Sequence, residues 1–258
     1  MDVSALVGDR TCRLPALAVA ASLLHAAAPP GIAAQDAPAT SPAAIAAEYR
    51  VDGLEGRRFT HARLWSAISA ALAADSDGRL RRTPLGRSVE GRAIEAITFG
   101  SGPTTVLLWS QMHGDESTAS MSLADIIHWV AASPADDPFR RRLEERLTVT
   151  MIPMLNPDGA ERFIRHNALG VDVNRDARKL ATPEGRILKA VRDSLDADFG
   201  FNLHDQGSRT AGSDGELVAI ALLAPAADEE RSWTPTRQRA RHLSAVIAAS
   251  LEPAIPGK

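Results

Sequence analysis

The sequence predicts an α/β fold in which helices cover both faces of a sheet. Short apolar runs typical of strands alternate along the chain with longer segments whose apolar residues recur at helical spacing. One of these runs, residues 104–109, is β-branched or apolar throughout, which is typical of a strand buried on both faces. Two pairs, Thr182-Pro183 and Thr234-Pro235, place a capping residue and a proline directly before helical patterns. Together these observations favour three layers: helices, sheet and helices.

The first part of the chain contains two predicted helices and three predicted strands. Leu64, Ile68 and Leu72 recur at helical spacing and are followed by the turn-forming run Asp75-Ser76-Asp77-Gly78. Ser117 can cap a second helix, whose apolar stripe includes Met121, Ala124, Ile127 and Ala131. The strands are predicted at residues 93–99, 104–109 and 147–154. Turn residues follow the first and the last of them, in the runs Gly100-Ser101-Gly102-Pro103 and Asn156-Pro157-Asp158-Gly159.

The remainder of the chain adds two helices and two strands. The helix after Thr182-Pro183 carries the apolar residues Leu188, Val191 and Leu195. The helix after Thr234-Pro235 carries the apolar residues Ala240, Leu243, Ile247 and Leu251. Two apolar runs, residues 199–203 and 217–223, are predicted to be strands. In an α/β sheet the active site lies at the carboxyl ends of the strands, so the residues there are the first candidates for chemistry.

The composition indicates a globular protein and excludes several classes. Of the 258 residues, 45% are hydrophobic and 24% are charged, which argues against disorder, collagen and a disulfide scaffold. Lys and Arg number 29 against 32 Asp and Glu, and the net charge of −3 argues against nucleic acid or an anionic membrane as the main partner. The only cysteine is Cys12, which excludes a disulfide within the chain.

The N-terminal region is typical of an exported protein. Arg10 and Arg13 precede an apolar run over residues 14–28, and the small residues up to Ala34 offer a cleavage site. This order predicts a signal peptide over residues 1–34 and a secreted or periplasmic protein, whereas an alanine-rich tail leaves the order unexplained. The apolar run is too short to span a membrane. An Ala- and Pro-rich tether is predicted over residues 35–48, followed by one domain over residues 49–258.

Histidine and glutamate residues stand at the ends of two predicted strands. His113 and Glu116 follow the strand at residues 104–109, on a turn that Gly114 permits, and His204 follows the strand at residues 199–203. Two histidines and one glutamate form a three-ligand zinc set that leaves a fourth position for water, which is the catalytic form of a zinc site. Taken alone, the spacing His-x-x-Glu is as consistent with an ordinary surface turn as with a metal site.

Five stretches, in order between residues 85 and 206, resemble a known family. They are Gly86-Arg87-Ser88-Val89-Glu90-Gly91-Arg92, His113-Gly114-Asp115-Glu116, Asn156-Pro157-Asp158-Gly159, Val171-Asp172-Val173-Asn174-Arg175 and Leu203-His204. On these stretches the sequence resembles the zinc metallocarboxypeptidases, the carboxypeptidase A-like or M14-type peptidases. The resemblance implies a three-layer α/β fold with a mixed sheet and helices on both faces.

The resemblance also implies a metal site. One zinc ion per chain would be held by His113, Glu116 and His204. Asp172 matches the carboxylate that accepts the free ring N–H of His113 and so fixes its tautomer. Zinc lowers the pKa of bound water and polarises the carbonyl, while a carboxylate takes the proton and returns it to the leaving amine. The implied activity is hydrolysis of the C-terminal peptide bond of a peptide.

By the same resemblance, Asn174 and Arg175 bind the free C-terminal carboxylate of the peptide substrate. A guanidinium can make two parallel charge-assisted hydrogen bonds to a carboxylate, so this pair would recognise a chain end. Arg165 matches the arginine that polarises the scissile carbonyl and stabilises the oxyanion. Arg162 stands close enough in the sequence to compete for this role.

The sequence departs from the family toward its C-terminus. The family's general-base glutamate and substrate-capping tyrosine lie late in the chain, whereas this sequence ends at Lys258 and its only tyrosine is Tyr49. We therefore expect a C-terminally truncated domain without the general-base Glu and the last strands, and with weak or no turnover. Two alternatives stay open. One is a zinc amidohydrolase acting on N-acyl amino acids or cell-wall peptides, and the other is a non-catalytic pseudoenzyme that binds zinc and carboxylates.

Overall fold

The structure, a computed structural model, describes residues 42–205, 210–211, 216–217, 220–226 and 228–251. All of these residues belong to one compact unit, Thr40–Lys258. The predicted signal peptide and the first part of the predicted tether lie outside the described residues. The described part of the tether forms a helix, α2 (Pro42–Glu48). None of the helices described is both long enough and apolar enough to cross a membrane.

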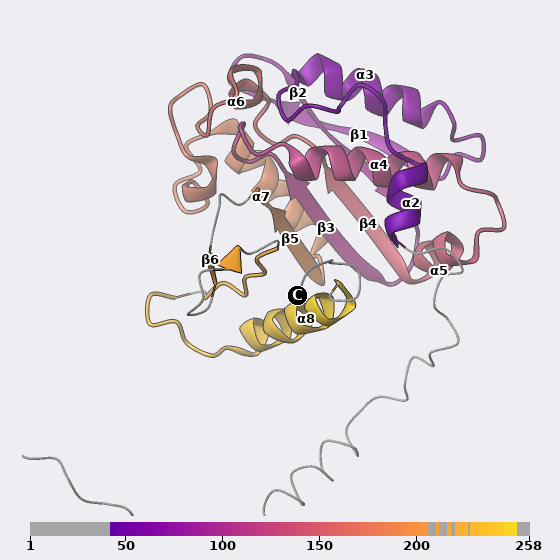
Figure 1. Cartoon of the computed structure of the whole chain (residues 1–258). Coiled ribbons are helices and arrows are strands. Elements are labelled where there is room, and N and C mark those ends of the chain that lie inside the picture. Colours follow the sequence, from indigo (N-terminus) through magenta and orange to yellow (C-terminus); the bar gives the residue numbers. More distant parts are fainter. Residues whose placement is uncertain (1–41, 206–209, 212–215, 218–219, 227, 252–258) are drawn as a thin grey trace, which may run out of the picture. The chain divides into compact units, whose positions relative to one another are not determined.

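A five-stranded mixed sheet forms the centre of this unit (Figure 1). The strand order is β1-β2-β4-β3-β5. β1 pairs with β2 and β2 with β4 in antiparallel fashion, whereas β3 is parallel to both β4 and β5. The strands are β1 (Leu80–Arg87), β2 (Ala93–Phe99), β3 (Thr104–Ser110), β4 (Leu147–Ile152) and β5 (Phe199–Leu203). A separate short ladder consists of β6 (Thr210–Ala211) and β7 (Glu216–Leu217).

Helices bury both faces of the sheet. The covering helices are α3 (His61–Leu72), α4 (Thr118–Ala132) and α7 (Pro183–Leu195). Ile97 and Phe99 of β2 belong to the core formed with α3 and α4, whereas Ile94 and Ala96 of the same strand belong to the core formed with α7. Successive side chains of a strand point to opposite faces, so these two cores lie on opposite sides of the sheet. The predicted α/β fold with helices on both faces is confirmed.

Capping side chains fix where several helices begin. Thr182 accepts a hydrogen bond from the N–H of Gly185 at the start of α7, as its cap-and-proline pair predicts. Thr234 does the same for α8 (Pro235–Leu251). Asn156 caps α6 (Pro157–Arg162), so the segment predicted as a turn is the beginning of a short helix.

Three further details of the sequence prediction are wrong. The strand predicted over residues 147–154 ends at Ile152. Of the strand predicted over residues 217–223, Leu217 belongs to β7 and residues 218–219 lie outside the described residues. Residues 220–223 have no regular secondary structure, and the side chains of Ile220 and Leu223 are exposed. Ser117 does not cap α4 with its side chain, because its hydroxyl donates to the carbonyl oxygen of Arg57 instead.

The patterns also missed β1 and α5 (Pro138–Arg146). β1 is polar, contains Pro84 and has an irregular register between Pro84 and Gly86, all of which are tolerated because it lies at the edge of the sheet. α5 is largely charged and so has little apolar periodicity. Asp137 nevertheless caps α5 directly before Pro138, so the signal that identified α7 was present here too.

Replacing Leu64 with alanine should destabilise the protein more than replacing Leu72. Leu64 is fully buried between α3 and the sheet, whereas Leu72, at the end of the same helix, is only partly buried. We expect Leu64→Ala to lower the free energy of unfolding by about 3 kcal/mol and Leu72→Ala by about 1 kcal/mol. Urea denaturation followed by circular dichroism would measure both, and equal losses would contradict this packing of α3.

Candidate metal centre

The turn after β3 is held by Gln111 and Gly114. Gln111 has a φ of 50°, a left-handed backbone conformation that is uncommon for a residue with a side chain. Its buried amide donates to the carbonyl oxygen of Gly114 and accepts from the hydroxyl of Ser120 on α4. A Cβ atom at Gly114 would come within 2.0 Å of the backbone of Gly159. Glycine is therefore required here by close contact with α6.

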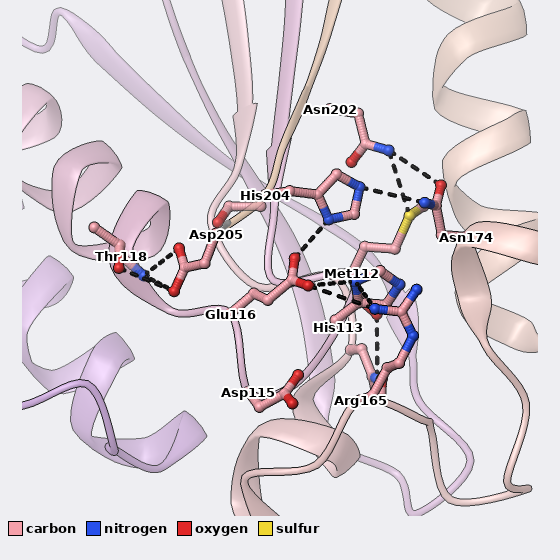
Figure 2. Close-up of polar contacts among 12 residues, drawn as sticks. Met112, His113, Asp115, Glu116, Thr118, Arg165, Asn174, Asn202, His204 and Asp205 are labelled. Atoms are coloured by element: carbon pink, nitrogen blue, oxygen red, sulfur yellow. Dashed lines mark hydrogen bonds and ion pairs between the residues drawn. The ribbon is translucent and has the colours of Figure 1, made fainter. Parts of the chain in front are cut away.

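This turn and the end of β5 bring His113, Glu116 and His204 together (Figure 2). β3 and β5 are parallel neighbours with Ser110 opposite Leu203, so the residues that follow both strands leave the sheet at the same edge. Oε1 of Glu116 lies 2.8 Å from Nδ1 of His113, and Oε2 of Glu116 lies 2.6 Å from Nδ1 of His204. These are the three residues predicted as metal ligands.

The three side chains fit a zinc ion. Their candidate ligand atoms all lie within 4.8 Å of one another. A tetrahedral zinc ion with bonds of about 2.1 Å holds its ligand atoms about 3.4 Å apart, so small side-chain rotations would accommodate it. Two imidazole nitrogens and one carboxylate are also the donors of catalytic zinc sites that leave one position for water.

Asp172 determines which nitrogen of His113 faces the other two side chains. Its Oδ1 lies 3.1 Å from Nε2 of His113, whose side chain is almost completely buried. An N–H group at Nε2 that donates to this carboxylate leaves the lone pair of Nδ1 available for a metal. Oδ2 of Asp172 accepts from Nε and Nη2 of Arg165, at 3.1 and 2.9 Å. One carboxylate therefore orients both the histidine and the arginine.

The electrostatics of the centre favour a cation. Burial disfavours the charged form of Glu116, but hydrogen bonds and charges from His113 and His204 outweigh burial and lower its pKa to about 2. Burial also disfavours the charged form of Asp172, but hydrogen bonds and charges from Arg165 and His113 outweigh burial and lower its pKa. Burial alone would lower the pKa of His113, yet its hydrogen bonds to the two carboxylates raise it. Two ionised carboxylates thus stand beside the histidines at neutral pH.

Arg165, rather than Arg162, contacts two of the three clustered side chains. Nη1 of Arg165 lies 3.1 Å from Nδ1 of His113 and 3.6 Å from Oε1 of Glu116. Arg162 pairs instead with Glu90. Of the two arginines that the sequence left open, the geometry therefore places Arg165 at the centre.

The predicted substrate-binding pair lies in the short 3-10 helix η2 (Val173–Arg175), directly after Asp172. The amide of Asn174 is 3.4 Å from Nε2 of His204 and accepts a hydrogen bond from Asn202. The guanidinium of Arg175 is exposed, and its contact with the described residues is a long one, 3.4 Å to the backbone oxygen of Asn174. The two parallel N–H donors of this guanidinium are therefore available to bind a ligand.

A buried pair shapes the loop that joins Arg165 to Asp172. Asn167 accepts hydrogen bonds from two backbone N–H groups of this loop and donates to Glu184 at 3.0 Å. Glu184 lies in the first turn of α7 and is completely buried. Burial raises the pKa of Glu184, which favours the protonated acid.

Sequence patterns gave no role to several residues around the centre. Most of them bind segments that are distant in the sequence, and no local pattern marks such a contact. Asn202 could have been noticed, because it precedes the candidate ligand His204 by two residues and successive strand residues alternate between faces. The residues without an assigned role are Arg57, Gln111, Thr118, Ser120, Asn167, Glu184 and Asn202.

A comparison with family models defines the class of the protein. Residues 66–210 match the Peptidase_M14 model, described as zinc carboxypeptidase, and this match includes more than half of the chain. The chain therefore belongs to the zinc carboxypeptidase family. The resemblance inferred from five short motifs is confirmed.

Individual relatives agree with this family. Carboxypeptidase 2 of Trichophyton rubrum is 26% identical over 158 residues, which are 60% of this chain and 28% of that protein. Carboxypeptidase D of Mus musculus is 33% identical over 125 residues, which are 40% of this chain and 9% of that protein. The chain thus spans less than a third of the length of either relative.

Solved structures show the same fold. A metallo-carboxypeptidase from Burkholderia cenocepacia has a TM-score of 0.52 and 26% identity, over 58% of this chain and 42% of that chain. A metallo-carboxypeptidase from Pseudomonas aeruginosa, in complex with (2-guanidinoethylmercapto)succinic acid, has a TM-score of 0.50 and 25% identity, over 58% and 40% of the two chains. The five-stranded sheet and its helices are therefore part of a carboxypeptidase fold.

Glu184→Gln should remove a pH dependence of stability that burial imposes. Below pH 4.5, the ordinary pKa of this side chain, both the folded and the unfolded chain carry the protonated acid. Between pH 4.5 and the raised pKa of the folded state, only the unfolded chain loses its proton. The free energy of unfolding then falls by up to about 1.4 kcal/mol per pH unit. Glutamine keeps an oxygen for Asn167 without titrating, so the variant should not show this fall.

Urea denaturation of both proteins between about pH 4 and about pH 8, with a chelator present, would measure the effect. The difference in unfolding free energy should grow in favour of Glu184→Gln as the pH rises. Glu145→Gln, which changes an exposed glutamate, is the control and should follow the parent protein. A constant difference between Glu184→Gln and the parent would contradict a raised pKa.

Proposed function

We propose that this chain carries the metal centre of a zinc-dependent metallocarboxypeptidase, which hydrolyses the C-terminal peptide bond of peptides. The observation that carries the proposal is the convergence of His113, Glu116 and His204, with Asp172 behind His113. Membership of the zinc carboxypeptidase family supports it. One zinc ion per chain and an exported, secreted or periplasmic location, from the signal peptide expected over residues 1–34, are parts of the same proposal.

In this proposal His113, Glu116 and His204 hold the zinc ion, which when bound lowers the pKa of a water molecule and polarises a carbonyl group. Asp172 keeps Nδ1 of His113 available and holds Arg165 by two donors of its guanidinium. Nη1 of Arg165 is left directed toward the centre. There it can donate to the oxygen of a substrate carbonyl and stabilise the negative charge that develops on it.

Arg175 and Asn174 would recognise the C-terminal end of the peptide substrate. The exposed guanidinium of Arg175 can bind both oxygens of a terminal carboxylate, which an internal peptide bond does not offer. Asn174 lies between Arg175 and His204, within 3.4 Å of the ring of His204. A substrate bound by its C-terminus on η2 would therefore present its last peptide bond near the three ligands.

Peptide hydrolysis also needs a carboxylate that takes the proton of the attacking water and returns it to the leaving amine. Two carboxylates of the centre, Glu116 and Asp172, are engaged by histidines and by Arg165. The proposal assigns the proton transfer to neither of them. A chain without such a carboxylate would still bind zinc and a peptide terminus, which is the non-catalytic alternative.

Arg175→Ala should lower kcat/KM for an N-blocked dipeptide by about 100-fold. The variant loses two charge-assisted hydrogen bonds to the substrate carboxylate, together worth about 3 kcal/mol. Arg178→Ala, which removes another exposed arginine three residues later, is the matched control and should leave kcat/KM unchanged.

Glu116→Gln should abolish both zinc binding and turnover. The assay is the release of the C-terminal amino acid by the zinc-loaded full chain.

The outcomes separate the alternatives. Zinc binding that Glu116→Gln abolishes, without turnover of any substrate, would favour the non-catalytic protein. Faster cleavage of an N-acetyl amino acid than of the blocked dipeptide would favour the amidohydrolase. Equal effects of Arg175→Ala and Arg178→Ala would contradict recognition of the chain end by Arg175.

A further inference from the structure

Asp205 connects two segments of the candidate metal centre without being one of the predicted ligands. It follows His204 directly, and its side chain is only 10% exposed. Its carboxylate accepts hydrogen bonds from the backbone N–H of Thr118 at 3.2 Å and from the hydroxyl of Thr118 at 2.9 Å. Figure 2 shows the carboxylate turned away from the ring of His204 and toward Thr118. Thr118 stands two residues after Glu116.

The contact with Thr118 supplies a cap that α4 otherwise lacks. The first N–H groups of a helix have no partner within the helix, and they carry a partial positive charge. Ser117, at the capping position of this 15-residue helix, makes no side-chain cap because its hydroxyl donates to the backbone carbonyl oxygen of Arg57. Asp205 provides both an acceptor and a negative charge at this helix end, from a position 87 residues away in the sequence.

Arg57 completes the link between the two segments. Its Nη2 donates to Asp205 at 2.8 Å and to the carbonyl oxygen of Asp115 at 3.3 Å. Its own carbonyl oxygen accepts from the hydroxyl of Ser117. The residues on both sides of Glu116 are thus attached to Arg57, and Arg57 is attached to Asp205.

This link differs from the direct contact between Glu116 and His204. The direct contact joins Oε2 of Glu116 to Nδ1 of His204, and each of these atoms is a candidate to bind a metal. This contact therefore cannot hold the two segments at a fixed distance once its two atoms bind a metal ion instead of each other. The contacts of Asp205 use no candidate ligand atom, so metal binding does not require them to break.

We propose that Asp205 is a positioning residue that sets the distance between Glu116 and His204 for metal binding. The proposal rests on the proposed zinc site. Both oxygens of Asp205 are engaged, Oδ1 by the Thr118 N–H and Oδ2 by Arg57 and the Thr118 hydroxyl, so Asp205 acts through its neighbours rather than as a ligand.

Asp198 offers a matched control at the opposite end of β5. Its Oδ2 accepts a hydrogen bond from the backbone N–H of Thr105, the second residue of β3, at 2.9 Å. An aspartate therefore ties each end of β5 to a backbone N–H of another segment. Only Asp205 is at the end where the candidate ligands lie.

The test is the zinc affinity of the full chain, measured by competition with a chromophoric chelator. Asp205→Ala should weaken zinc binding by about tenfold, which is typical of residues that orient metal ligands. Asp205→Asn, which keeps an acceptor for Thr118 but loses the charge, should fall between the parent and Asp205→Ala. Asp198→Ala should bind zinc as the parent does. The visible spectrum of the cobalt-substituted protein should change in Asp205→Ala and not in Asp198→Ala, because it depends on ligand geometry.

Zinc affinity and cobalt spectrum unchanged in Asp205→Ala would overturn the proposal. An equal loss of affinity in Asp198→Ala would also overturn it, since the effect would then be a general loosening of β5. Should Asp205→Ala not fold, the comparison of Asp205→Asn with Asp198→Asn decides in the same way. Zinc affinity that does not change in His113→Ala would instead overturn the proposed zinc site itself.

Discussion

The parallel pairing of β3 with β5 is the constraint on which the candidate metal centre depends. Because Ser110 lies opposite Leu203, the turn that carries His113 and the residue His204 emerge side by side from the sheet. Every other contact of the centre refines this placement. Asp172 turns the ring of His113, and the carboxylate of Glu116 spans the gap to His204. A shift of one residue in this pairing would send the side chains of β5 to the opposite face.

The fold was largely predictable because its central strands are buried on both faces and its helices have clear beginnings. Continuous apolar runs identified β3 and β4, and the pair Thr182-Pro183 identified α7. The prediction of secondary structure failed where the apolar pattern of the sequence and the burial in the structure disagree. β1 is a polar edge strand, and residues 220–223 are apolar but exposed. Periodicity records which residues could be buried, whereas pairing with a neighbouring strand decides which of them are.

The candidate ligands were predictable for a different reason from the residues that support them. The candidate ligands follow strand ends, where the active sites of α/β sheets lie, and they belong to short sequence motifs; they are His113, Glu116 and His204. The supporting contacts join positions far apart in the chain, such as Asp205 with Thr118 and Asn167 with Glu184. A carboxylate that caps a distant helix looks in the sequence like any other surface aspartate. Only the folded chain gives it a partner.

The separation of the candidate ligands along the chain affects the order of folding. His113 and Glu116 are three residues apart, whereas Glu116 and His204 are 88 residues apart. The first pair can form with its own turn, but the second must wait until the long loop between them has closed and β5 has joined β3. An ion that needs all three residues would bind only the folded chain, and it would stabilise the fold by about 4 kcal/mol at a free metal concentration about a thousandfold above its Kd. A metal bound at one edge of the sheet would therefore raise the free energy of unfolding of the whole unit.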